Sequence, residues 1–334
     1  MRPCRRYAFL HKSFQEIFAA YCLCFKLLKH KITPESLVSD ARYFNELKHV
    51  LLFSCGILAV QCEERAVDLL TNITTQVNKF GKNLVPITLE YIAECKREKS
   101  NVHGKLARVF GSGLELQNVE VKNTTLEKVH IASLSEAMKV NTALTQLTLM
   151  ANEIGAAGAA SLAEAMKVNI TLTQLNLRTN EIGAVGATSL AEAMKVNTTL
   201  TQINLRANEI GAAGTACLAE VMTVNTTLTQ LNLRANEIGA AGAASLAEAM
   251  KVNTTLTQLD LSDNSIGDAG AASIAEAMKV NITLTQLNLR ANEIGAGGAA
   301  SLCDAVKVNT SQTQLDLSYK LALVLLSLLP LLRQ

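Results

Sequence analysis

A regular alternation of apolar and polar positions marks much of the second half of this chain. In the segment TLTQLNLRTNEIG, Leu175 and Leu177 alternate with polar residues, and Leu172 and Ile182 lie to either side. An alternation with a period of two is typical of a strand that buries one face. The pattern therefore predicts a short strand. Its polar face carries Gln174, Asn176 and Arg178.

The next segment changes to a helical period. From Gly186 the sequence reads GATSLAEAMKVN, in which apolar residues stand at i, i+3, i+4 and i+7. This spacing predicts a helix with one buried stripe. The stripe consists of Ala187, Leu190, Ala191 and Met194. Its alanines let the helix lie close to the strand, and Asn197 after the helix fits a left-handed C-terminal stop.

The strand and the helix recur every 28 residues. An Asn stands at each of positions 141, 169, 197, 225, 253, 281 and 309, and the unit is close to NTTLTQLNLRANEIGAAGAASLAEAMKV. Six complete copies run from 141 to 308, and a seventh departs after Ser318. Residues 123–140 read as the same unit with its loop and helix start missing. One copy cannot bury its own apolar face, so stacking must stabilise the array.

The spacing L-x-x-L-x-L-x-x-N-x-I is the signature of a leucine-rich repeat. We expect an α/β solenoid with parallel strands on the concave face and helices on the convex face. The Asn of the signature recurs at 152, 180, 208, 236, 264 and 292. We expect it to point inward and bond loop backbone groups, because buried backbone groups need partners.

A small all-α region is expected before the repeats. Apolar patterns predict helices at about 12–30, 44–59, 63–79 and 86–99, with Pro86 at a helix start. Such helices would cap the first strand of the solenoid. The expected division is a helical region at 1–122, the repeats at 123–318, and an apolar tail or cap at 319–334.

Composition narrows the class of protein. The 334 residues carry 31 Lys and Arg against 29 Asp and Glu, so the net charge is +2. This balance excludes full disorder and gives no strong attraction for nucleic acid. The longest apolar run, Leu321–Leu332, contains Pro330 and is shorter than the roughly 20 residues of a membrane-spanning helix. We expect a cytoplasmic protein that does not span a membrane.

Cysteine, histidine and Asn-x-Ser/Thr patterns are interpreted as structural. Most of the 8 Cys and all 5 His lie before residue 131, without the spacing of a zinc site. We interpret the cysteines as buried reduced thiols. The repeated Asn-x-Thr reflects a repeated helix end, so glycosylation is not expected.

The repeat unit resembles the ribonuclease-inhibitor-like class of leucine-rich repeats, which NACHT-type NOD-like receptors and Ran GTPase-activating proteins carry. Residues 9–21, FLHKSFQEIFAAY, resemble a motif near the end of the NACHT helical region, and residues 51–58 resemble the apolar helix that follows it. The resemblance implies the C-terminal portion of a NOD-like receptor. Its function would be protein interaction in intracellular, innate immune signalling.

Two other classes of protein are alternatives to a receptor-type module. A Ran-type or other small-GTPase regulator shares the repeat class, but it usually ends in an acidic tail, whereas this chain ends in LALVLLSLLPLLRQ. An enzyme has no support in the sequence. No G-x-x-x-x-G-K-[ST] loop is present, so we expect no ATP site, cofactor, metal or small-molecule substrate. The expected partner is a protein.

Residues beside the buried leucines on the strand face are the candidate binding residues. They form ladders across the repeats, and the partner-binding set is Asn176, Arg178, Asn204, Arg206, Asn232, Arg234, Asp260, Asn288 and Arg290. The alternative is that these arginines pair with Glu181 and its equivalents across repeats and only keep the face soluble.

One irregular repeat adds a charge feature to this surface. Residues 253–280 carry LDLSDNSIGDAG, in which Ser262 replaces Arg and Asp263 and Asp268 are added. We expect an acidic notch beside the arginine ladder, with a protein partner that spans Arg206, Arg234 and Asp260.

Overall fold

The computed structural model describes residues 12–38, 47–96, 101–309, 311 and 314–317. The chain divides into two compact units. The first unit comprises Met1–Leu116 with Glu136–Ala143, and the second comprises Gln117–Ser135 with Leu144–Gln334. The predicted tail at 319–334 lies outside the described residues.

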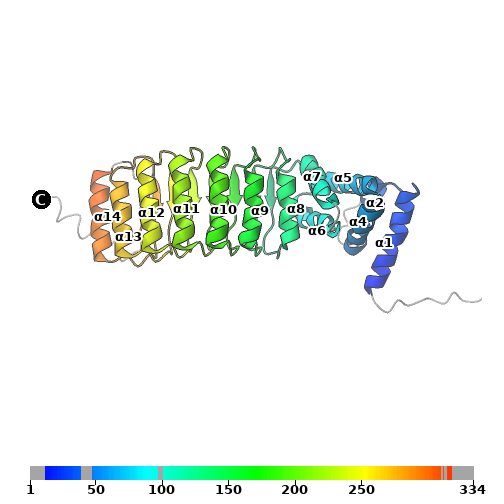
Figure 1. Cartoon of the computed structure of the whole chain (residues 1–334), viewed down its shortest axis with the longest axis horizontal. Coiled ribbons are helices and arrows are strands. Elements are labelled where there is room, and N and C mark those ends of the chain that lie inside the picture. Colours follow the sequence, from blue (N-terminus) through cyan, green and yellow to red (C-terminus); the bar gives the residue numbers. More distant parts are fainter. Residues whose placement is uncertain (1–11, 39–46, 97–100, 310, 312–313, 318–334) are drawn as a thin grey trace, which may run out of the picture. The chain divides into compact units, whose positions relative to one another are not determined.

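The first unit is all-helical, as the apolar patterns predict. Its elements are α1 (Lys12–Leu28), α2 (Pro34–Val38), α4 (Lys48–Gln61), α5 (Glu63–Phe80), the 3₁₀ turn η1 (Lys82–Leu84), α6 (Val85–Glu94) and α7 (Val102–Gly113) (Figure 1). Helices α1, α4, α5 and α6 match the predicted segments, and Pro86 lies in the first turn of α6. The sequence patterns missed α2, which is too short to show a period, and α7, whose three glycines obscure its apolar stripe.

Large apolar side chains fill the core of the first unit. Leu58, Leu69, Ile73, Ile92 and Phe110 are fully buried. Helix α1 packs on α4, α4 packs on α6, and α5 packs on α7. The amphipathic helices therefore bury their apolar stripes against one another.

The second unit alternates strands and helices, and its strands form one sheet of eight parallel strands in chain order. The strands are β1 (Asn118–Glu120), β2 (Gln146–Thr148), β3 (Gln174–Asn176), β4 (Gln202–Asn204), β5 (Gln230–Asn232), β6 (Gln258–Asp260), β7 (Gln286–Asn288) and β8 (Gln314–Asp316). The helices are α8 (Lys128–Met138), α9 (Gly155–Met166), α10 (Gly183–Val196), α11 (Gly211–Val224), α12 (Gly239–Val252), α13 (Gly267–Met278) and α14 (Ala296–Val308).

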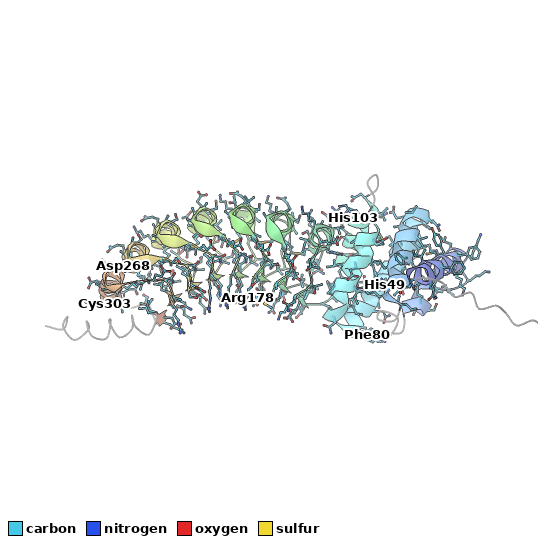
Figure 2. The ribbon with its side chains drawn as sticks, turned by 90° about the horizontal axis from the view of Figure 1, so that it is seen from below. His49, Phe80, His103, Arg178, Asp268 and Cys303 are labelled. Atoms are coloured by element: carbon cyan, nitrogen blue, oxygen red, sulfur yellow. The ribbon has the colours of Figure 1, made fainter. Side chains whose placement is uncertain are left out.

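Strands line the inner side of the curved array and helices line the outer side (Figure 2). This confirms the predicted solenoid. The central residue of β3, Leu175, is buried, and so is the helical stripe of Ala187, Leu190, Ala191 and Met194. Each repeat therefore buries its leucines between its own strand and helix layers.

The register of β1 corrects the interpretation of residues 123–140 as a shortened copy. Asn118 pairs with Gln146 and Val119 pairs with Leu147, so β1 lies 28 residues before β2. Leu126 is buried in the position equivalent to Ile154. The repeat register thus includes the strand that precedes Asn123.

The side chain of the Asn in the repeat signature bonds backbone groups of its own and the preceding repeat, as expected. The Nδ2 of Asn180 donates to Leu149 O at 2.7 Å and to Leu177 O at 2.9 Å. Its own N–H donates to Oδ1 of Asn208 at 3.0 Å. These side chains are buried, so the ladder satisfies loop groups that water cannot reach.

The second Asn ladder, which follows each helix, corrects one local prediction. Asn197 has extended backbone angles, φ −74° and ψ 128°, rather than a left-handed conformation. Its Nδ2 donates to Met166 O at 2.7 Å, and its Oδ1 accepts from Leu200 N at 2.8 Å. The amide is buried, which gives the repeated Asn-x-Thr a structural role.

Each repeat has two positions that require glycine, for different physical reasons. Gly183 has φ +63°, a left-handed angle that suits glycine at the turn into α10. At Gly186 an added Cβ would lie 2.5 Å from Ile182 Cγ2 and 3.1 Å from Ala156 Cα on the preceding helix. Close packing of neighbouring helices therefore requires glycine there.

Candidate functional site

A polar groove follows the inner, strand side of the array. It has a volume of about 460 Å³ and is lined by the side chains that alternate with the buried leucines. The register aligns them, so Gln174, Gln202 and Gln230 form one row and Asn176, Asn204 and Asn232 form the next. The strand period and the parallel register together create these rows.

Five of the nine sequence-predicted residues line this groove, and the other four, the arginines, follow the strands that form it. Asn176, Asn204, Asn232, Asp260 and Asn288 are the last residues of their strands and line the groove. The four arginines stand two residues later. Arg178, Arg206 and Arg234 are half-buried, whereas Arg290 is exposed. Figure 2 shows Arg178 on the strand side of the array.

The asparagines of the groove position the arginines. Asn176 Oδ1 accepts the backbone N–H of Arg178 at 3.1 Å, and Asn204 Oδ1 accepts that of Arg206 at 3.0 Å. The same bond recurs in the following repeats. These short side-chain-to-backbone bonds hold the chain in a turn at the end of each strand. The backbone at each arginine is therefore held in an equivalent position in every repeat.

The arginine row, defined as Arg178, Arg206 and Arg234, carries three positive charges close together. Among the described residues, no ion pair joins any of them to a carboxylate. The Nε atoms of Arg178 and Arg234 are buried without a hydrogen-bond partner. Burial, together with the charges of Arg178 and Arg234, lowers the pKa of Arg206. The charges of Asp260 and Asp263 offset this effect only in part, so the row is an incompletely compensated cationic cluster.

The lysines on the helix side of the array form ion pairs, unlike the arginine row. Lys195 bonds Glu192 at 2.7 Å, and Lys251 bonds Glu248 at 2.6 Å. The hydrogen bond that Lys195 donates to Glu192 raises the pKa of Lys195. Comparable pairs, three residues apart, form at Lys167, Lys279 and Lys307. The lysines of the outer face therefore have local partners, unlike the arginine row.

The alternative interpretation, that arginines and glutamates pair across repeats, is wrong for this row in the described structure. Glu181 is exposed, and both Thr179 and Glu181 have left-handed backbone angles, with φ 57° and 56°. Two left-handed residues within three positions redirect the chain after each arginine. Nearness in sequence therefore does not bring the carboxylate to the guanidinium.

The predicted acidic notch is smaller than expected. Asp260 lies in the groove and accepts from Ser262 Oγ at 2.7 Å and from Asn232 Nδ2 at 3.3 Å. Asp268 instead accepts backbone N–H groups of Gly295 at 2.6 Å and Gly298 at 3.0 Å, at the start of α14. It therefore caps the next helix, beside the helix layer (Figure 2).

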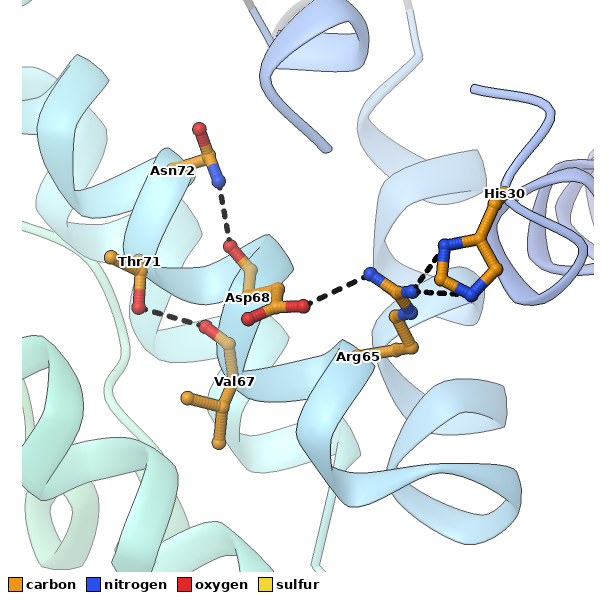
Figure 3. Close-up of polar contacts among 6 residues, drawn as sticks. All are labelled: His30, Arg65, Val67, Asp68, Thr71 and Asn72. Carbon is orange, nitrogen blue, oxygen red and sulfur yellow. Dashed lines mark hydrogen bonds and ion pairs between the residues drawn. The ribbon is translucent and has the colours of Figure 1, made fainter. Parts of the chain in front are cut away.

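A polar cluster in the first unit was not predicted. Arg65 Nη2 lies 2.6 and 2.8 Å from the two ring nitrogens of His30, and Arg65 Nη1 lies 3.2 Å from Asp68 Oδ2 (Figure 3). His30 and Arg65 are 35 residues apart, so no local sequence motif predicts the contact. It ties the segment after α1 to helix α5.

The thiols of the first unit are mostly buried, although Cys22 is exposed, contrary to expectation. Cys4 lies outside the described residues. Burial, with the neighbouring Cys95 and Cys24, raises the pKa of Cys55 well above its ordinary value. The protonated thiol is a poor metal ligand and a poor nucleophile. In the described part of the chain, no group of His, Cys, Asp and Glu is arranged to hold a metal ion.

The comparison with protein families identifies the repeat. The family described as "Leucine Rich repeat" matches six segments, at 140–163, 168–191, 196–219, 224–247, 252–275 and 280–303. Together with the eight-stranded parallel array, these matches show that the chain carries leucine-rich repeats. No curated protein sequence matches the chain significantly. Over the described residues, no helix has the length and apolarity that crossing a membrane requires.

Several solved structures resemble part of the chain. Leiomodin-1 actin-binding site 2 is 24% identical with a TM-score of 0.33, over 48% of this chain and 78% of that one. The tropomodulin C-terminal domain of Caenorhabditis elegans is 18% identical with a TM-score of 0.38, over 45% and 91%. The leucine-rich-repeat-containing protein LegL7 of Legionella pneumophila is 14% identical with a TM-score of 0.41, over 71% and 79%.

Proposed function

We propose that this chain is a protein-interaction module that binds its partner on the strand face of the array. The observation that supports this is the arginine row, which holds three half-buried cations that form no ion pair among the described residues and are only partly offset by Asp260 and Asp263. Keeping like charges together with only partial compensation is unfavourable for the free protein. A partner that supplies negative charge would remove this cost on binding and be oriented by the row.

The setting that we propose is intracellular signalling of the NOD-like-receptor type. Its support is the resemblance of the repeat class and of residues 9–21 and 51–58 to those receptors. Within that setting the chain acts as a cytoplasmic sensor or regulator through binding. The proposal assigns no ATP binding to the chain, because it has no phosphate-binding glycine loop.

The test compares charge reversal on the two faces. Arg206→Glu with Arg234→Glu alters the strand face, and Lys195→Glu with Lys251→Glu is a control with the same charge change on the helix face. Both variants, purified and shown to be folded by circular dichroism, are used to capture proteins from cytosolic extract for mass spectrometry.

We expect the strand-face variant to lose the specific partner that wild type captures, and the helix-face variant to retain it. Equal recovery by both variants would show that the strand face is not the binding surface. A partner lost only by the helix-face variant would move the site to the opposite side of the array.

A further inference from the structure

The arginine row has defined ends. The equivalent position is Met150 in the repeat before Arg178 and Ser262 in the repeat after Arg234. One repeat before Met150, Lys122 occupies the position and is paired with Glu120. Beyond Ser262, the exposed Arg290 stands alone. The unpaired cations therefore cover three consecutive repeats, β3 to β5, and stop on both sides.

The spacing of the row favours one backbone conformation in a partner. Neighbouring strands lie about 4.7–4.9 Å apart, so three equivalent positions span roughly 10 Å. On an α-helix, residues i, i+3 or i+4, and i+7 share one face and also span roughly 10 Å, because the rise is about 1.5 Å per residue. Alternate residues of an extended strand advance about 6.6 Å each, so three of them overshoot the row. A helix that runs along the array matches the row.

Guanidinium groups favour carboxylates as partners. The planar group can donate two parallel hydrogen bonds to one carboxylate, and such pairs are stronger than neutral hydrogen bonds. Beside the row, Gln202, Asn204 and their equivalents line the groove and offer amide groups to a helix surface. The groove therefore combines a cationic edge with a polar floor.

We propose that the groove binds an acidic α-helix of a protein partner, with carboxylates at i, i+3 or i+4, and i+7 facing Arg178, Arg206 and Arg234. This inference rests on the proposed function, and it adds the chemistry and conformation of the partner segment. Each arginine pairs with one carboxylate, and the helix lies across β3, β4 and β5.

The residues at the two ends of the arginine row indicate two further side chains of the partner helix. Asp260 lies beyond Arg234 in the groove, and Asp263 is exposed nearby. A fourth carboxylate would be repelled there, so a Lys or Arg one turn further along the partner helix fits Asp260. At the opposite end, the half-buried Met150 accepts an apolar residue. The partner segment therefore reads, along one helix face, apolar, acidic, acidic, acidic, basic.

The experiment uses the full chain and a pair of stapled helical peptides labelled with a fluorophore. One peptide carries three glutamates and a lysine on a single face in this order. Its isomer has the same composition with the glutamates spread around the helix. A single-stranded oligonucleotide is a third probe. Fluorescence anisotropy measures binding to wild type, Arg206→Gln and the control Lys251→Gln at low and moderate salt.

We expect the ordered peptide to bind wild type at least about tenfold more tightly than its isomer or the oligonucleotide. Arg206→Gln should abolish that preference and Lys251→Gln should keep it. Equal binding of the two peptides, or tighter binding of the oligonucleotide, would overturn the acidic helix. If the peptides fail while the strand-face charge reversal still removes a captured partner, the proposed function stands and only the acidic helix falls.

Discussion

The backbone N–H of Asn208 donates to the Oδ1 atom of Asn236 at 2.9 Å, and the same bond links each of the central repeats to the next. Because Asn208 is fully buried, this contact replaces water for a loop group that has no other partner. The ladder makes the loops of neighbouring repeats depend on one another. Those loops follow the strands whose side chains line the groove.

Substitutions at and near Asn208 test this dependence. The Nδ2 of Asn208 bonds Leu177 O and Leu205 O, each at 2.9 Å, so Asn208→Ala leaves several buried groups unpaired at about 1–3 kcal/mol for each group. Leu205→Ala opens a cavity and should cost about 2–5 kcal/mol. The free energy of unfolding, measured by chemical denaturation, should fall in both variants.

The control for this pair is Glu220→Ala on the outer face. Its carboxylate is 70% exposed and lies 3.6 Å from Lys195, so the change should be within about 0.5 kcal/mol. A loss at Glu220 as large as the loss at Asn208 would contradict the inward and outward assignments.

Gly186 tests the close packing of the helices. The Cβ of Gly186→Ala would lie 2.5 Å from Ile182 Cγ2, which is buried and cannot move aside freely. Overpacking of this kind should lower the free energy of unfolding by about 1–3 kcal/mol. Val185→Ala is the matched control, since Val185 is 73% exposed. Thermal denaturation that finds Gly186→Ala as stable as Val185→Ala would be inconsistent with the observed spacing.

His103 makes the stability of the first unit depend on pH. Burial, with the charge of Lys96, lowers the pKa of His103 below its usual 6.5. The unfolded chain therefore takes up a proton that the folded chain resists. The contribution of His103 to stability is present above about pH 6.5 and is lost as the pH falls through the folded-state pKa. His103→Gln should flatten the dependence of the melting temperature on pH in this range. An unchanged slope would exclude His103 as its source.

Arg206→Gln tests whether Arg206 serves partner binding rather than the stability of the fold. The substitution removes the middle charge of a cluster that repels itself in the free protein. We expect the melting temperature to stay the same or rise. Lys195→Gln, which breaks a pair with Glu192, should give no rise. A marked loss of stability in Arg206→Gln would show that Arg206 is a structural residue.

The sequence predicts the parts of the fold that follow from the regular spacing of apolar residues. The alternation around Leu175 and Leu177 predicts the strand, the stripe from Ala187 to Met194 predicts the helix, and the interval of 28 residues predicts the parallel register. The inward role of Asn180 also follows, because a buried loop needs hydrogen-bond partners. Five of the nine predicted site residues line one groove for the same reason, and the four arginines follow its strands.

What the sequence could not predict depends on local backbone angles. The unpaired state of Arg178 follows from the left-handed conformations of Thr179 and Glu181, which neither residue type favours by itself. Asp268 was expected on the strand face, but it caps α14, a helix one repeat further on. The start of the strand array at β1 was missed because Val119 and Val121 stand where later repeats carry leucine.

Site-specific photo-crosslinking tests the central claim most directly. A benzophenone side chain placed at Gln230 in the groove, and separately at the half-buried Ser245 on the outer helix side, is activated in cytosolic extract. The account predicts a discrete adduct from Gln230 that disappears when Arg206→Glu and Arg234→Glu are added, and no matching adduct from Ser245. An adduct from Gln230 that survives the charge reversals, or a discrete adduct from Ser245 alone, would contradict it.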